Sequence, residues 1–176
     1  FANCINLASY SIPATVKSIG DYAFYGCTSL SSYAFSYVTA IGNRVFANSG
    51  ISSVVFGNKV VSCGSAVFEG CEKLRTVTYK SPITKVPDSM FSGCINLQTL
   101  SFDIDHDLTF GKYSFEGCSK LSNVTAPCYL EKELQTITAN YKLNHSFEGV
   151  AYSKCSNCSY TRAIDKARCN TSCYLE

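Results

Sequence analysis

The feature of this sequence that most constrains its fold is a motif, F-x-x-C-x-x-L, that returns at an almost constant spacing. Consecutive copies begin 22 to 24 residues apart, at Phe1, Phe24, Phe46, Phe68, Phe91 and Phe115. Cysteine fills the fourth place in every copy except one, where Ser49 stands. A unit of this length cannot bury its apolar side alone, so a period in this range indicates a repeat architecture. We therefore expect the units to stack around one continuous core.

Each copy continues past its leucine with alternating apolar residues, such as Leu74, Val77 and Tyr79. Residues two apart share one side of an extended chain, so the pattern predicts one short strand per repeat. Because every strand runs in the same direction, the strands should form one parallel sheet. A second apolar pair and a glycine follow, such as Val16, Ile19 and Gly20, and we interpret this glycine as a turn signal.

The residues from Phe1 to Ala126 resemble the BspA-like class of leucine-rich repeats, best over Ile19 to Leu30, Phe68 to Tyr79 and Phe91 to Phe102. Ser49, and Cys63 in place of isoleucine, depart from the pattern. The resemblance implies a mostly β, α/β-type leucine-rich-repeat solenoid: a right-handed stack of about six repeats with one parallel sheet. Members of this class are typically cell-surface or secreted proteins, and several are adhesins, although a fold does not define a function.

The chain has eleven cysteines, and five of them stand at the fixed place of the repeat: Cys4, Cys27, Cys71, Cys94 and Cys118. Stacked side chains in parallel register point the same way and do not meet disulfide geometry. We expect these five to be small buried hydrophobic residues, not a metal or redox array.

The repeat pattern degenerates near the C-terminus. A shortened copy, Leu134, Ile137 and Ala139, predicts that the solenoid spans residues 1–139 and that a cysteine-rich cap spans 140–176. Three states of the tail cysteines are open: two disulfides, a structural zinc site or reduced thiols. We predict the first of these, two disulfides formed by Cys155, Cys158, Cys169 and Cys173. Cys128 is left over.

The outward positions of the predicted strands carry small residues, most of them with a hydroxyl group. We predict a ligand-binding face for a protein or glycan there. The same residues also suit an exposed β surface by propensity alone. The predicted face consists of Ser32, Ser53, Thr76, Thr78, Thr99, Ser101, Asn123 and Thr125.

The sequence offers no candidate catalytic residues. It has two histidines, no phosphate-binding glycine loop and no G-x-S-x-G motif. His106 lies in an acidic run with Asp103, Asp105 and Asp107, which could hold a hard cation through oxygen atoms. The run lacks the glycine and distal glutamate of a calcium loop, so we interpret it as a solvated loop and expect no metal and no cofactor.

The net charge of +2, without a basic cluster, gives no attraction for nucleic acid. No apolar run reaches the roughly 18 residues of a membrane helix, so we expect no membrane insertion. Four N-x-S/T sequons, where about two are expected by chance, hint at secretion and glycosylation; they begin at Asn123, Asn144, Asn157 and Asn170.

The sequence therefore predicts a non-catalytic protein-binding module of a cell-surface or secreted protein, acting through its sheet face. The alternative is an intracellular solenoid scaffold with a zinc site in its tail.

Overall fold

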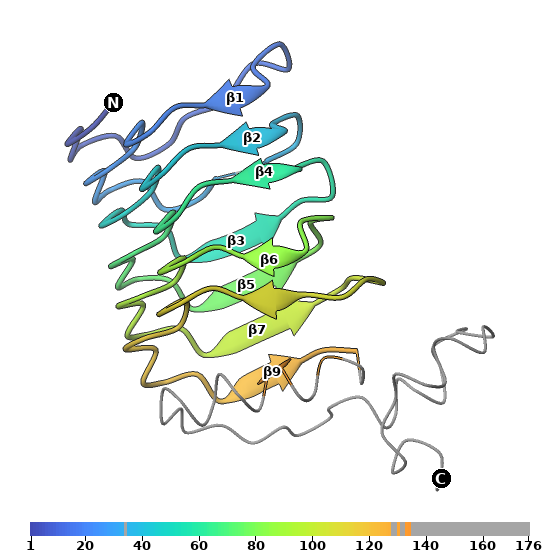
Figure 1. The fold of residues 1–176 in the computed structure, drawn as a ribbon. Coiled ribbons are helices and arrows are strands. Elements are labelled where there is room, and N and C mark those ends of the chain that lie inside the picture. Colours follow the sequence, from blue (N-terminus) through green and yellow to red (C-terminus); the bar gives the residue numbers. More distant parts are fainter. Residues whose placement is uncertain (34, 128–129, 131–132, 135–176) are drawn as a thin grey trace, which may run out of the picture.

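The computed structural model describes residues 1–33, 35–127, 130 and 133–134, and these residues form a β-solenoid of about five turns (Figure 1). Consecutive turns lie on one another along one axis, and each turn contains a single repeat of about 23 residues. The predicted stacking of repeats is confirmed. The predicted C-terminal cap, residues 140–176, lies outside the described residues.

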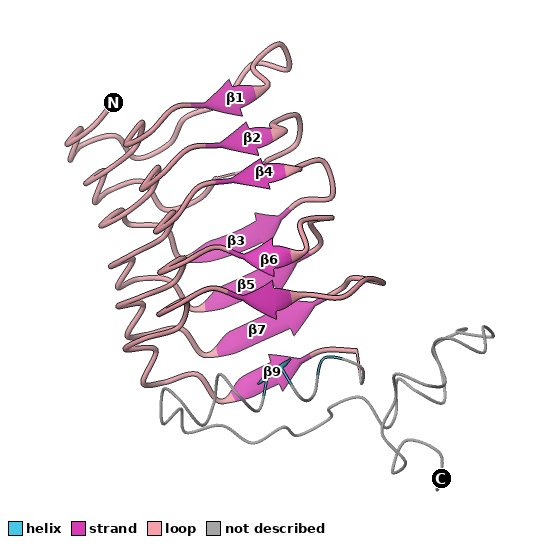
Figure 2. Ribbon diagram, in the orientation of Figure 1, coloured by secondary structure: helices cyan, strands magenta, loops and turns pink. Residues whose placement is uncertain are grey.

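The segment that contains Phe and Cys consists of successive tight turns and not of a helix (Figure 2). The Cys27 N–H donates to the Phe24 carbonyl at 3.2 Å, and the Leu30 N–H donates to the Cys27 carbonyl at 3.0 Å. One place in each turn, the third of the motif, requires a left-handed backbone, which glycine and asparagine tolerate best. Its φ values are 58° to 76°, at Asn3, Gly26, Asn48, Gly70, Gly93 and Gly117. The α/β-type designation is therefore corrected to a β-solenoid.

The main sheet has four parallel strands in the order β3-β5-β7-β9: β3 (Ser53–Phe56), β5 (Thr76–Tyr79), β7 (Thr99–Phe102) and β9 (Asn123–Thr125). Equivalent residues of successive repeats are paired, for example Val54 with Val77 and Val77 with Leu100. Burial alternates along each strand as the apolar pattern predicts, so Val77 and Tyr79 are buried while Thr76 is exposed.

The prediction of a single sheet is wrong, because the second apolar pair of each repeat forms strands of its own. These two-residue strands run against the direction of the main sheet in Figure 1 and form two further parallel ladders, β1-β2-β4 and β6-β8. Their bounds are β1 (Ser18–Ile19), β2 (Ala40–Ile41), β4 (Ser62–Cys63), β6 (Lys85–Val86) and β8 (Thr109–Phe110).

A proline explains why these short strands form two ladders instead of one. The glycines after β2, β4 and β8 donate their N–H to the preceding turn; for example, Gly64 donates to the Ile41 carbonyl and Gly111 to the Val86 carbonyl, both at 2.8 Å. Pro87 occupies the same place after β6 and has no N–H to donate. The ladder is therefore interrupted between β4 and β6.

The core is a column of stacked phenylalanines. Neighbouring rings are nearly parallel, with centroids 5.3 to 5.7 Å apart, from Phe1 through Phe24, Phe46, Phe68 and Phe91 to Phe115. The last four of these side chains are fully buried. Offset aromatic pairs at this distance contribute about 0.5–1.5 kcal/mol each beyond their burial. Leu130 and Leu134, which follow the last strand, are buried in the same core.

The first two repeats lack the predicted main-sheet strand. No strand is assigned to residues 8–12, nor to the described residues among 31–37. Tyr33 and Phe35 are nevertheless buried at the inward positions that the pattern predicts, whereas Tyr10 is 40% exposed. β3 is therefore the first strand of the main sheet among the described residues.

Candidate binding surface

The outward side chains of the main sheet form two rows in register. The first row joins Ser53, Thr76, Thr99 and Asn123, and the second joins Val55, Thr78, Ser101 and Thr125. Ser53, Thr76 and Asn123 are exposed, while Thr99 and the last three residues of the second row are partly exposed. The structure thus brings seven of the eight predicted face residues onto one surface, which we call the sheet face.

Ser32 is the eighth predicted residue, and it is exposed outside the main sheet. Val55 was not among the predicted binding residues, although it is 54% exposed at the β3 end of the second row. An exposed valine among hydroxyl residues gives the sheet face an apolar contact. Its place in the alternating pattern was the signal that could have identified it.

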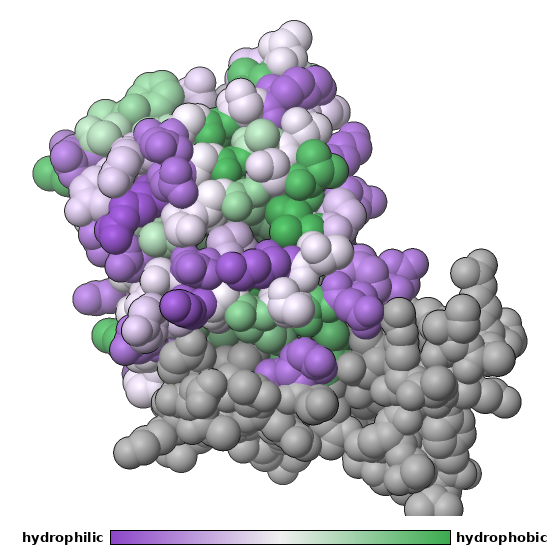
Figure 3. Space-filling model, in the orientation of Figure 1, coloured by the Kyte–Doolittle hydropathy of each residue, from purple (hydrophilic) through white to green (hydrophobic). Residues whose placement is uncertain are grey.

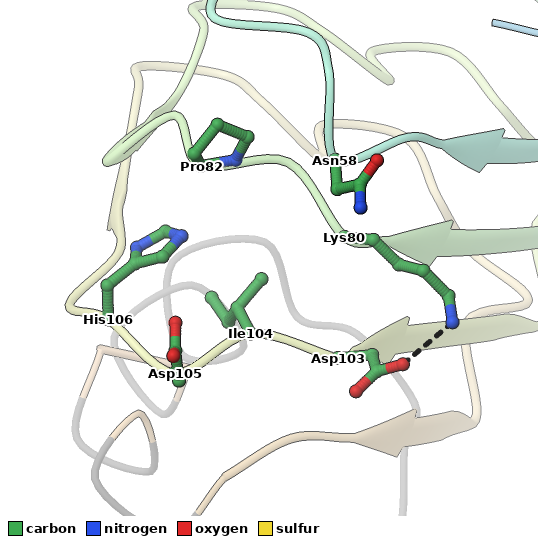
Figure 4. Close-up of a pocket in the computed structure, with 7 residues that line it drawn as sticks. All are labelled: Asn58, Lys80, Pro82, Asp103, Ile104, Asp105 and His106. Atoms are coloured by element: carbon green, nitrogen blue, oxygen red, sulfur yellow. Dashed lines mark hydrogen bonds and ion pairs between the residues drawn. The ribbon is translucent and has the colours of Figure 1, made fainter. Parts of the chain in front are cut away.

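A hollow of about 450 Å³ lies where the strands of the main sheet end (Figure 4). Asn58, Lys80 and Asp103 come from the segments that follow β3, β5 and β7, respectively. Asp105 and His106, which belong to the acidic run with Asp103, also line the hollow. The Lys80 ammonium forms an ion pair with the Asp103 carboxylate at 2.8 Å. Both side chains are largely exposed, so this pair contributes little to stability. It places a fixed pair of charges beside the uncharged sheet face.

His106 fastens the acidic run to the neighbouring repeat. Its Nε2 lies 3.0 Å from the Ser81 carbonyl oxygen, and its Nδ1 lies 2.9 Å from the Asp107 carbonyl oxygen. Both contacts are hydrogen bonds at once only if both ring nitrogens carry a proton. Within the described residues, no group of three or more His, Cys, Asp or Glu side chains is arranged to hold a metal ion.

The cysteines of the repeat do more than fill space. Cys71, Cys94 and Cys118 are fully buried, and each thiol donates to the carbonyl oxygen of the phenylalanine in the preceding turn, with Sγ–O distances of 3.0 to 3.2 Å. Sequence reasoning missed this cross-turn hydrogen bond. Burial raises the pKa of the Cys71 thiol to about 11 and that of the Cys118 thiol to about 12.

The six cysteines in the described residues, Cys4 and Cys63 included, are all free thiols. Cys27, Cys71, Cys94 and Cys118 are buried, as predicted for the repeat cysteines, but Cys4 is exposed. In the described chain, no turn covers the side of the first repeat on which Cys4 lies. The expectation that all five are buried is therefore wrong for Cys4.

Several predicted site residues lie outside the described residues: Cys155, Cys158, Cys169 and Cys173 of the tail, and the sequon asparagines Asn144, Asn157 and Asn170. Their disulfides and glycans stay predictions, as does the boundary at residue 139. Asn123 is the sequon residue within the described chain, and it is exposed on β9. A glycan there would stand at one end of the sheet face.

The opposite face of the solenoid carries β1, β2 and β4 and is the one seen in Figure 3. Hydrophobic surface on this face is interrupted by hydrophilic side chains. Val61, beside β4, is 65% exposed. No helix among the described residues is long and apolar enough to span a membrane.

The sequence matches the family model described as the BspA type leucine-rich repeat region, in six copies over residues 1–122 and 108–166. The protein is a repeat protein of the β-solenoid class, and within that class this chain belongs to the BspA-type leucine-rich repeat family. The resemblance found in the sequence is confirmed. Members of this family are typically non-catalytic and often surface-associated.

Solved structures of bacterial leucine-rich repeat proteins are similar to this chain. The Treponema pallidum protein TpLRR is 26% identical over 84% of this chain and 64% of its own, and a Eubacterium ventriosum protein is 30% identical over 67% and 32%. A Bacteroides ovatus protein is 21% identical over 73% and 39%, which shows the fold alone. The TM-score is 0.61 in all three cases.

This chain spans less than two thirds of the length of each of these proteins. No curated protein matches it significantly.

Proposed function

We propose that this chain is a non-catalytic binding module of a cell-surface or secreted protein, and that it recognises a protein or glycan ligand through the sheet face. The observation that carries this proposal is the register of the exposed side chains. Ser53, Thr76, Thr99 and Asn123 form one row of hydroxyl and amide groups on a rigid sheet. Solenoids commonly use such extended surfaces for binding.

The chemistry of the sheet face favours many weak contacts over one strong anchor. Its strand residues carry no charge, and neither row contains tryptophan, tyrosine or arginine, the residues enriched at binding hot spots. Hydroxyl groups in register can hydrogen-bond a protein backbone or sugar hydroxyls, and Val55 adds an apolar contact. Affinity should therefore grow with the number of repeats that contact the ligand at once.

Binding to a glycan array and to immobilised extracellular-matrix proteins tests this proposal. Thr78→Arg combined with Ser101→Arg places two long charged side chains in the centre of the sheet face. Ser62→Arg, on exposed Ser62 of β4, is the matched control because it adds the same side chain to a different ladder. The proposal predicts that the double variant loses at least tenfold in affinity while the control binds like wild type. Equal binding by all three proteins, or no binding by the wild type, would refute it.

A further inference from the structure

A second hollow, of about 380 Å³, lies between the first two repeats. Four serines and two partly exposed tyrosines line much of it: Ser9, Ser11, Ser32, Ser36, Tyr10 and Tyr37. The serines are all exposed, and the tyrosines are 40% and 45% exposed. Hydroxyl groups and aromatic rings therefore share one concave surface, and its volume falls in the range of small-molecule sites.

The described backbone around this hollow does not form a sheet. In the main sheet, residues at the equivalent positions are joined by parallel ladders, such as β5 to β7. Residues 8–12 form no such ladder with residues 32, 33 and 35–37, and no backbone hydrogen bond joins these described residues. Backbone N–H and C=O groups without a partner among the described residues thus lie beside the serine hydroxyls. Polar backbone groups of this kind need water or a ligand as a partner.

Tyr33 adds a further unpaired group. This residue also lines the hollow, it is 8% exposed, and its hydroxyl is buried without a hydrogen-bond partner in the described part of the chain. The ring itself is held in the core by Phe35 and Phe46, at centroid distances of 4.8 and 4.5 Å. A buried hydroxyl left without a partner costs free energy that a bound polar group would recover.

Two lysines bring positive charge to the same place. The Lys17 and Lys59 ammonium groups lie 5.6 and 5.2 Å from the centroid of the Tyr37 ring. Neither lysine takes part in a salt bridge among the described residues. The Lys17 ammonium also donates to the Ala14 carbonyl at 2.8 Å. Positive charge without a salt bridge among the described residues therefore lies at Tyr37, which lines the hollow, while the two lysines are not themselves among its lining residues.

We propose that this hollow binds an acidic saccharide, a sugar ring that bears a carboxylate or a sulfate. The sugar hydroxyls pair with the serines and the open backbone groups, the ring packs on tyrosine, and the anionic group lies against Lys17 and Lys59. This inference rests on the proposed binding function. For the case in which the ligand is a glycan, it names a specific site and a ligand class. The hydroxyl-rich lining favours a saccharide over a simple anion, and the two lysines favour an acidic sugar over a neutral one.

The test is an NMR titration of the 176-residue chain at low salt with glucuronate, glucose 6-sulfate, glucose and inorganic sulfate. We expect glucuronate or glucose 6-sulfate to shift the amide signals of Ser32 and Tyr37 and to bind at least tenfold more tightly than glucose and sulfate do. Combining Lys17→Ala with Lys59→Ala should lower the affinity to that of glucose. The matched control, Lys112→Ala, removes an exposed lysine near the opposite end of the stack and should leave binding unchanged.

Three results would overturn the proposal: equal affinity for glucose and for both acidic sugars, sulfate alone binding as tightly as the acidic sugars, or signal shifts confined to other residues. Thr78→Arg combined with Ser101→Arg separates this site from the sheet face. That variant should still bind the acidic sugar even though it loses the ligand of the sheet face. Failure of the sugar titration, with docking on the sheet face intact, defeats this inference alone.

Discussion

Two glycines at the same place in different repeats should respond in opposite ways to the same substitution. Gly64 directly follows β4. A Cβ built on Gly64 would lie 2.6 Å from the Gly42 carbonyl carbon and 2.7 Å from the Asn43 nitrogen. Contacts below 3 Å with backbone atoms are relieved only if two turns move apart. Overpacking of this kind typically costs about 1–3 kcal/mol, so we expect Gly64→Ala to be destabilised by that amount.

Gly20 is the matched control, because it directly follows β1 in the same way and a Cβ built on it meets no atom within 4 Å. There, alanine restricts mainly the unfolded chain, so Gly20→Ala should be neutral or more stable by about 0.4–1 kcal/mol. Urea unfolding, followed by circular dichroism and by the fluorescence of the twelve tyrosines, measures both variants under reducing conditions. Equal destabilisation of the two variants, or a neutral Gly64→Ala, would refute the close contact between successive turns.

Three further predictions concern the thiols and one the surface ion pair. Native protein treated with iodoacetamide at pH 8 should be alkylated at exposed Cys4 and not at buried Cys71, as mass spectrometry of peptides will show. Burial raises the folded-state pKa of Cys71 from 9.0 to about 11, so the thiol ionises in the unfolded chain at a lower pH than in the folded protein. The free energy of unfolding, measured from urea curves, should therefore be constant below pH 9 and decrease between pH 9 and 11. Cys94→Ala should lose about 1–2 kcal/mol in urea unfolding, since it removes buried volume and the donor to the Phe68 carbonyl; no loss would show that this hydrogen bond is unimportant. Lys80→Ala should change stability by less than about 1 kcal/mol, because the pair with Asp103 is exposed; a larger loss in the same assay would contradict this.

The repeat length and the inward-facing residues were predictable from the sequence because both follow from periodicity. The 22-residue spacing of Phe24, Phe46 and Phe68 predicted the aromatic column, and alternation predicted that Val77 and Tyr79 are buried. The short strands were missed, because a two-residue strand such as Lys85–Val86 has no periodic signal of its own. The glycine or proline that follows such a strand is typical of a turn. The strand is recognised only from its pairing with the neighbouring repeat.

The candidate site was predictable where strand alternation holds and not beyond it. Seven of the predicted face residues lie on the sheet because each stands directly beside an apolar inward residue in the strand. Ser32 precedes an inward residue in the same way, yet its segment forms no ladder, so local alternation alone did not decide pairing. The hollow is lined by residues of the first two repeats, and the ammonium groups near its Tyr37 come from Lys17 of the first repeat and Lys59 of the third. No spacing in the sequence predicted this arrangement.

The stacking of rings from successive repeats can be measured directly by nuclear Overhauser effects in protein with labelled phenylalanines, with signals assigned by single Phe→Leu variants. The structure predicts ring-to-ring effects for Phe46 with Phe68 and for Phe68 with Phe91, whose centroids are 5.6 and 5.7 Å apart, and none for Phe46 with Phe91, which are two turns apart. Effects between Phe46 and Phe91, or their absence between adjacent repeats, would contradict the solenoid.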